Sequence, residues 1–300
     1  MENLLLLFVC LSLGVVLGRG KVFPPGAHHS LNAFVINVSL SALCLYYIPK
    51  ITFSTEILLP VAVAWINIAL AFLIFHFLGP RLGFSRAVTG AVVLCVGFGN
   101  TSFVGIPVIS ALYGPEAIKT VMLVDQPGSF VALSTVGIFL VNFYSGKAVG
   151  VVQSLRRIFS FPPFLMFLLA LLMALSGLSF PKTLDSVFSS LGATTVPLAL
   201  VSVGLQLKVE RWHPYEKPLL LGLLFKLLLF PLFIFILYRH ILGVDTEMAE
   251  VAIMESAMGP MITASILASS YGLAPRLCNL FIGVGIPLSL LTLYAWHLLL

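Results

Sequence analysis

The chain has 300 residues, of which 60% are hydrophobic and only 9% are charged, and its mean hydropathy is +1.11. A soluble domain needs about a quarter of its residues charged to build a hydrated surface, so this composition excludes a soluble enzyme domain, a nucleic-acid-binding protein and a disulfide-rich secreted protein. It predicts an integral membrane protein. The net charge of +5 therefore bears on orientation in the bilayer rather than on a nucleic-acid partner.

Long apolar stretches recur along the chain between charged and turn-forming residues. About 20 apolar residues cross a hydrocarbon core of ~30 Å as a helix, and uninterrupted stretches of this kind favour helices over barrel strands. The sequence predicts an all-α protein with ten transmembrane helices. They cover residues 3–18, 30–48, 57–79, 85–113, 117–143, 161–178, 187–207, 218–240, 247–271 and 275–299.

The basic residues are distributed unevenly between the two sides of this arrangement. The odd-numbered connections contain Arg19, Lys21, Arg81, Arg86, Lys147, Arg156, Arg157, Lys208, Arg211, Lys217 and Arg276. The even-numbered connections contain Lys50, Lys119, Lys182 and Arg239, and Lys226 remains within a span. Cytoplasmic loops carry an excess of Lys and Arg, so we expect the odd connections in the cytoplasm and both termini outside the cell.

The longest cytoplasmic connection divides the chain into two halves with five spans each. Because five is odd, the second half must run opposite to the first. Tyr113-Gly114 closes the fourth span, and Tyr271-Gly272 closes the ninth span 158 residues later. We therefore predict two inverted five-helix repeats, residues 1–145 and 161–300, joined by a cytoplasmic linker at 146–160.

The fourth and ninth spans carry helix-breaking residues near their middles. Residues 97–107 contain three glycines and a proline, and the ninth span contains Gly259-Pro260. Freed backbone groups must line a cavity or be buried in protein, and inverted-repeat transporters place their sites at such breaks. A proline kink is the alternative for either span taken alone. The candidate substrate-binding residues are Asn100, Thr101, Ser102, Pro107, Gly259, Pro260 and Lys226.

The segment from Gly99 to Pro107, with the sequence Gly-Asn-Thr-Ser-Phe-Val-Gly-Ile-Pro, resembles the crossover motif of the auxin efflux carrier family, bacterial relatives of the plant PIN-type carriers. Similar matches are Thr195-Val-Pro-Leu-Ala-Leu and the pair Lys226…Pro231; Ser41 departs from the family's usual proline. The resemblance implies the fold of bile-acid sodium symporters. Spans one, two, six and seven would form a panel, the other six a core, and the broken fourth and ninth spans would cross.

Three ionisable residues lie about 12 Å deep, eight residues into their spans. A charge at the bilayer centre costs at least ~2.5–3.5 kcal/mol, so Asp125, Lys226 and Glu255 require partners or a function. Glu255 is the main coupling candidate, binding sodium or carrying a proton. Asp125 is the second candidate, with Gln126 and Ser129 nearby. A buried Asp125–Lys226 ion pair is the structural alternative.

The breaks also predict the kind of substrate. Half-helices beginning near Phe103 and Met261 would point their N-termini at the centre of the membrane, and such ends favour anions. Lys226 would add a positive charge. The resemblance implies small organic acids, such as auxin or dicarboxylates.

The sequence therefore predicts a secondary active carrier of small organic anions in the plasma or bacterial inner membrane, with the lipid bilayer around it. The alternatives are a sensor or binding protein that retains the transporter fold, or a channel. No catalytic motif points to an enzyme. We expect no cofactor, and no metal beyond a coupling sodium ion at Glu255. Gly14 and Gly18 form a small-residue pair that can pack two helices or a homodimer.

Overall fold

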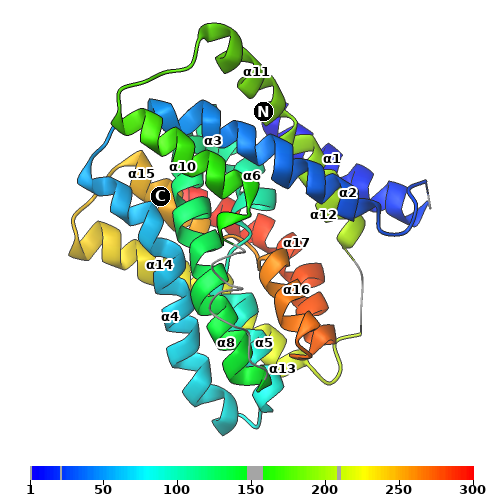
Figure 1. Ribbon diagram of the computed structural model, residues 1–300. Coiled ribbons are helices and arrows are strands. Elements are labelled where there is room, and N and C mark those ends of the chain that lie inside the picture. The colour runs from blue at the N-terminus through cyan, green and yellow to red at the C-terminus, as the bar shows by residue number, and fades with distance from the viewer. Residues whose placement is uncertain (1, 21, 147–157, 208–210) are drawn as a thin grey trace.

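The computed structural model describes residues 2–20, 22–146, 158–207 and 211–300 (Figure 1). The middle of the predicted linker 146–160 therefore lies outside the described residues. So do five of the basic residues that set the predicted orientation: Lys21, Lys147, Arg156, Arg157 and Lys208. The described part of the chain is almost entirely helical and holds no β-strand beyond one isolated bridge.

The helices of the first half follow the predicted stretches closely. They are α1 (Glu2–Arg19), α2 (Ala27–Phe34), η1 (Val35–Leu40), α3 (Ser41–Tyr47), η2 (Ile48–Lys50), η3 (Thr55–Ile57), α4 (Leu58–Arg81), α5 (Arg86–Gly97), η4 (Thr101–Gly105), α6 (Ile106–Tyr113), η5 (Pro115–Ala117), α7 (Ile118–Leu123), η6 (Val124–Phe130), η7 (Leu133–Gly137) and α8 (Ile138–Ser145). Several of these join end to end into single long helices through π-helical or 3₁₀ turns.

The second half repeats this density of helix. Its elements are α10 (Pro162–Leu175), α11 (Lys182–Ala193), α12 (Thr195–Gln206), α13 (Glu216–Leu224), η8 (Phe225–Leu229), α14 (Phe230–Phe235), η9 (Ile236–Ile241), α15 (Glu247–Ser256), α16 (Ile262–Ser270) and α17 (Pro275–Leu299).

Six helical stretches are long and apolar enough to cross a membrane, judged by length and composition among the described residues. They are Ala27–Lys50, Thr55–Arg81, Pro115–Ser145, Lys182–Gln206, Glu216–Ile241 and Pro275–Leu299. Four shorter apolar helices accompany them: Leu5–Arg19, Arg86–Gly97, Thr101–Tyr113 and Pro162–Leu175. The prediction of an all-helical protein with several spans is confirmed, whereas ten complete crossings in two inverted repeats stay a prediction.

The helices pack in two groups. In one group α1, the helix formed by α2, η1 and α3, and the helices α10, α11 and α12 pack mainly against one another (Figure 1). In the other group α4 packs on α5, η6 and α15, while α16 packs on α17 and α5. The same group includes α7, η4 and α6, because α7 packs on η6 and α15, η4 on η6, and α6 on α7. Segments from both halves of the chain contribute to each group. We call the first group the panel and the second the core.

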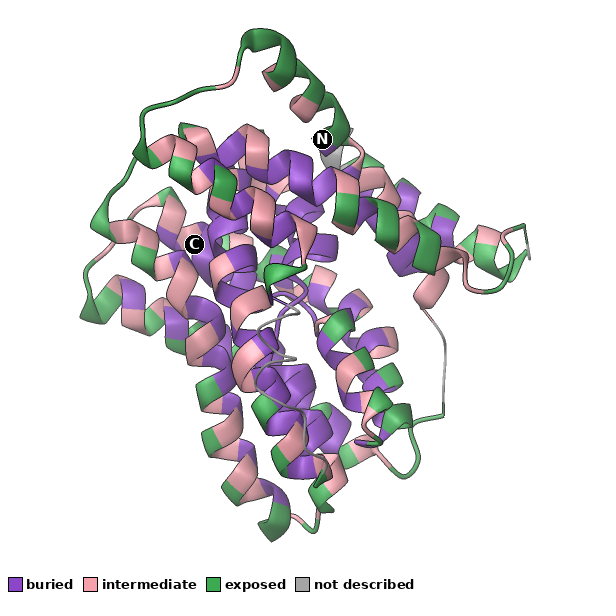
Figure 2. Cartoon of the chain, viewed as in Figure 1, coloured by how far each residue is buried: buried purple, intermediate pink, exposed green. Residues whose placement is uncertain are grey.

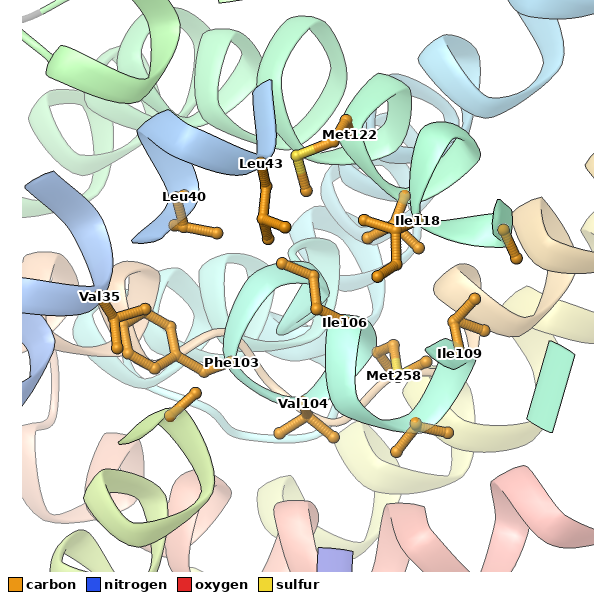
Figure 3. Close-up of a cluster of buried hydrophobic side chains, with 14 of the residues drawn as sticks. Val35, Leu40, Leu43, Phe103, Val104, Ile106, Ile109, Ile118, Met122 and Met258 are labelled. Atoms are coloured by element: carbon orange, nitrogen blue, oxygen red, sulfur yellow. The ribbon is translucent and has the colours of Figure 1, made fainter. Parts of the chain in front are cut away.

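A cluster of apolar side chains joins the panel to the core. Val35, Leu40 and Leu43 of the second helical stretch face Phe103 and Ile106 of the core (Figure 3). All five are buried, and the deeply buried residues concentrate along the centre of the molecule (Figure 2). The panel therefore rests on the segment that follows the break in the fourth stretch.

Close approach of backbones holds α1 against α12 within the panel. A Cβ atom added at Gly14 would lie 2.3 Å from the carbonyl oxygen of Val201 and 2.9 Å from the Cα of Gly204. Small residues allow this contact, as is common between membrane helices. The small-residue pair of Gly14 and Gly18 thus packs two helices of one chain, and the homodimer stays a prediction.

We expect Gly14→Ala to lower the melting temperature of the purified protein, because overpacking against a backbone carbonyl costs about 1–3 kcal/mol. Gly18→Ala is the matched control, since its added Cβ would lie 3.2 Å from the movable Cδ2 of Leu205. Thermal unfolding of both variants in detergent checks this. Equal melting temperatures for the two variants would contradict the packing argument.

Candidate functional site

The fourth helical stretch is interrupted where its glycines cluster. Helix α5 ends at Gly97, and Phe98 is extended, with φ −112° and ψ 132°. The chain resumes helical structure in η4 at Thr101, where the side-chain oxygen of Asn100 accepts a hydrogen bond from the N–H of Phe103 at 3.2 Å. Asn100 thus caps the second half of the broken helix.

The ninth helical stretch is interrupted in the corresponding place, and the two interruptions pair. Helix α15 ends at Ser256 and α16 begins at Ile262. The Asn100 N–H donates to the carbonyl of Gly259 at 2.8 Å, and the Met261 N–H donates to the carbonyl of Phe98 at 3.1 Å. These bonds form an antiparallel bridge between Gly99 and Pro260. We call residues 98–100 and 259–261 together the crossing.

Asp125 lies beside the crossing and is 3% exposed. Its Oδ1 accepts hydrogen bonds from the hydroxyls of Thr101, at 2.5 Å, and Ser102, while its Oδ2 accepts one from Gln126 Nε2 at 2.7 Å. Among the described residues it forms no ion pair with Lys226. The alternative of a buried Asp125–Lys226 ion pair is therefore wrong for this structure. Three hydrogen-bond donors take the place of the lysine.

Glu255 lies on the last turn of α15 and is 1% exposed. Neither of its carboxylate oxygens has a hydrogen-bond partner among the described residues. The carboxylate packs on Gly105, where an added Cβ would lie 2.5 Å from Oε1 and 2.8 Å from Oε2. Because a buried carboxylate without a donor is costly, the group needs a proton or a cation.

Lys226 lies in the π-helical turn η8 and is completely buried. Its Nζ donates a hydrogen bond to the carbonyl of Ser256 at 3.2 Å. In a continuous helix that carbonyl would bond to residue 260, but Pro260 has no N–H. The lysine therefore replaces the missing backbone donor of the ninth stretch.

Asn67 of α4 is a site residue that the sequence reasoning missed. Its amide nitrogen donates to the hydroxyl of Ser256 at 2.9 Å, and that hydroxyl donates to the amide oxygen of Asn67 at 3.2 Å. Both residues are buried. The signal in the sequence is an amide in the middle of an otherwise apolar span, which needs a polar partner inside the protein.

A cavity of about 310 Å³ opens between the panel and the core at the crossing. Its polar lining comes from Asn100, Ser102, Asp125, Ser134, Ser160 and Thr263, and its apolar lining from Ile36, Leu40, Phe103, Phe130, Leu133, Ile138, Phe161, Met261, Ile262 and Leu267. Three predicted site residues thus share one cavity. Thr101 and Gln126 support Asp125 behind it, and Ser129 is buried with no partner for its hydroxyl among the described residues.

Other predicted site residues lie elsewhere. Pro107 lines a second cavity of about 350 Å³, together with Tyr46, Tyr47 and Pro197. Gly259 and Pro260 belong to the crossing, where Gly259 also packs on α17: an added Cβ would lie 3.1 Å from the Cα of Ile286. Lys226 and Glu255 contribute to neither lining.

Hydrogen-bond donors lie beside the first cavity, on residues that line it. Since the Asn100 oxygen accepts from Phe103, its Nδ2 faces away from the cap, and this buried nitrogen has no partner among the described residues. Helix α16 begins at the same place, its cap residue Met261 supplies no side-chain hydrogen bond, and Ile262 and Thr263 line the cavity. An uncapped helix N-terminus offers free N–H groups to an anion.

This geometry is that of a membrane transporter, with paired helix breaks beside a cavity. A profile of the family described as membrane transport protein matches the chain twice, over residues 1–149 and 147–297. The chain therefore belongs to the membrane transport protein family, a family of transporters rather than enzymes, and this confirms the resemblance to the auxin efflux carriers.

Several relatives share nearly the full length of the chain. An uncharacterized transporter of Methanothermobacter thermautotrophicus is 27% identical over 304 residues, covering 100% of this chain and 98% of its own. The uncharacterized transporter MJ1031 of Methanocaldococcus jannaschii is 24% identical, covering 90% and 89%. The uncharacterized transporter YfdV of Escherichia coli K12 is 23% identical, covering 91% and 89%.

We expect Gly105→Ala to destabilise the protein by about 1–3 kcal/mol, because the new methyl group would displace the Glu255 carboxylate. The double variant Gly105→Ala with Glu255→Ala should lose less stability than the two single losses combined, since contacting residues are not additive. Thermal unfolding of the three variants measures this. If the stability losses of the two single variants add up to that of the double variant, the contact between Glu255 and Gly105 is contradicted.

Proposed function

We propose that the protein is a secondary active carrier of small organic anions that works by alternating access about its two broken helices. Ten spans in two inverted repeats complete this proposal. The observation that carries it is the cavity at the crossing, which is lined by Asn100, by Ile262 and Thr263 at the start of α16, and by the buried residue Asp125.

The donors support an anionic substrate. Asn100 Nδ2 lacks a partner within the described residues, and α16 begins without a side-chain cap, so a carboxylate bound here would supply acceptors to both. The remaining wall is largely apolar, with Phe130 and Phe161 stacked at 4.0 Å between ring centroids. Such a wall accommodates the carbon skeleton of an organic acid.

The carboxylates support coupling to a cation. The carboxylate of Asp125 repels an anion that enters the cavity. Glu255 is close enough to Asp125 for the two carboxylates to repel each other as well. Adding a proton or a sodium ion to these carboxylates would remove that repulsion. Substrate and cation would then bind more tightly together than apart, which is the thermodynamic requirement for coupled transport.

The two cavities support alternating access. The first is lined by Ile138, Ser160 and Phe161, near the predicted cytoplasmic ends of their helices. The second is lined by Tyr47 and Pro115, near the predicted outer ends. Both lie between the panel and the core, so a movement of one group relative to the other can open one cavity while it closes the other.

The experiment is uptake by proteoliposomes with a panel of organic acids, imposing sodium and proton gradients separately. We expect Asn100→Ala to weaken apparent substrate affinity by about 10–100-fold, since a hydrogen bond to a charged group contributes about 1.5–3 kcal/mol. Asn37→Ala is the control, because the exposed side chain of Asn37 donates a hydrogen bond to the Ala33 carbonyl of its own helical stretch and does not line the cavity. Unchanged transport kinetics in Asn100→Ala would contradict the proposal that the substrate anion binds in this cavity.

The variant Glu255→Gln tests the coupling, because it keeps the shape of the side chain and removes its charge. We expect it to bind substrate but no longer accumulate it against a gradient. Exchange of labelled for unlabelled substrate should persist. Binding without any exchange in the wild type would instead indicate a sensor, and flux that does not saturate would indicate a channel. If Glu255→Gln still accumulates substrate fully, Glu255 is not the coupling residue and Asp125 is the remaining candidate.

The orientation has its own test. We propose that the protein lies in the plasma or bacterial inner membrane with both termini outside the cell. Cysteines introduced at residues 2 and 299, in a variant without Cys10, Cys44, Cys95 and Cys278, should both react with a membrane-impermeant maleimide added to intact cells. Protection of either position until the cells are lysed would refute the ten-span arrangement.

A further inference from the structure

Lys226 is the buried cation at the crossing, and the substrate cavity does not explain it. The side chain is completely buried, and it lines neither cavity described above. Its nitrogen also forms no ion pair within 4.0 Å among the described residues. A charge in such a place is costly unless its surroundings are arranged to hold it.

The ammonium is held by a carbonyl oxygen, a kind of ligand that small hard cations also take. It donates to the carbonyl of Ser256, an oxygen that Pro260 leaves without a backbone donor. It also packs on Gly99 of the fourth stretch, where an added Cβ would lie 3.2 Å from Nζ and 3.1 Å from the carbonyl oxygen of Glu255. Carbonyl and carboxylate oxygens are the ligands that hard cations such as sodium prefer.

The charges around Lys226 also favour a cation at this position. The carboxylate of Glu255 acts electrostatically on Lys226, and Asp125 brings a second negative charge into range of Glu255. The lysine therefore offsets one of two buried carboxylates without an ion from solution. A sodium ion at the break would have to enter beside the Lys226 nitrogen and compete with it for the Ser256 carbonyl, and this competition opposes its binding.

We propose that Lys226 stands in for a coupling sodium ion: its ammonium holds the carbonyl freed at the ninth-stretch break, so the crossing needs no sodium. This inference deepens the proposed function, and it rests on that proposal only in assuming that transport is coupled to a cation. The residue acts as a tethered cation that sets ion selectivity. Without a lysine at this position, the Ser256 carbonyl has no donor and the carboxylates of Asp125 and Glu255 have no positive charge beside them. A sodium ion can then bind there.

Thermal unfolding of the purified protein tests this without any transport measurement. The melting temperature is compared in sodium chloride, potassium chloride and choline chloride at equal ionic strength, for the wild type, Lys226→Ala and Lys226→Arg. We expect the wild type and Lys226→Arg to be indifferent to the cation. In choline chloride, Lys226→Ala should melt at a lower temperature than the wild type. In saturating sodium chloride its melting temperature should rise by about 5 °C.

Two results would overturn the proposal: a sodium-selective rise in the wild type, or a folded Lys226→Ala that is indifferent to sodium. If Lys226→Ala is too unstable to purify, the wild-type comparison decides alone, because selective stabilisation by sodium would show that the lysine does not take the place of the ion. Failure of every organic acid to enter proteoliposomes would refute the carrier and leave these melting temperatures unaffected, so the two failures are distinguishable.

Discussion

Backbone pairing between the two helix breaks is the constraint on which the arrangement of the site depends. A helix interrupted in hydrocarbon exposes N–H and C=O groups that cost several kcal/mol each if nothing satisfies them. Here the Asn100 N–H bonds to the Gly259 carbonyl and the Met261 N–H bonds to the Phe98 carbonyl. Each break thus satisfies one backbone donor and one backbone acceptor of the other. The same pairing brings the Asn100 side chain and the start of α16 to one cavity.

Proline creates further unsatisfied carbonyls, and side chains from distant helices satisfy them. The Leu227 carbonyl cannot bond to Pro231, and the indole nitrogen of Trp296 donates to it at 2.9 Å. The Ser256 carbonyl cannot bond to Pro260, and Lys226 donates to it at 3.2 Å. Missing N–H groups thus recruit polar side chains into the interior, so the breaks and the buried polar groups share one physical origin.

Much of the helical architecture could be predicted from local sequence. Apolar length located the helices, and the glycine and proline clusters located both interruptions, because each signal is contained within its own segment. The capping residue Asn100 and the buried Asp125 were identified for the same reason: an amide in a break and a carboxylate in a span are unusual wherever they face.

The partners of the buried charges could not be predicted in this way. Depth in the membrane placed Asp125, Lys226 and Glu255 at one level, but depth does not specify which side of the bundle a side chain faces. Asp125 therefore has Thr101, Ser102 and Gln126 as partners instead of the lysine. The contact of Gly105 with Glu255 and the bond of Asn67 to Ser256 join residues far apart in sequence, so only the packing of helices determines them.

The most direct test of the paired breaks is a disulfide cross-link between them in the membrane. Phe98 and Met261 lie opposite each other in the antiparallel pair. Residues opposite each other in such a pair have Cα atoms about 4.5–5.5 Å apart, which is within the range of a disulfide. In a variant without the four native cysteines, Phe98→Cys combined with Met261→Cys should cross-link on mild oxidation. Phe98→Cys combined with Ile266→Cys, five residues further along the chain and inside α16, should not. Absence of the first cross-link in a folded protein would contradict the crossing.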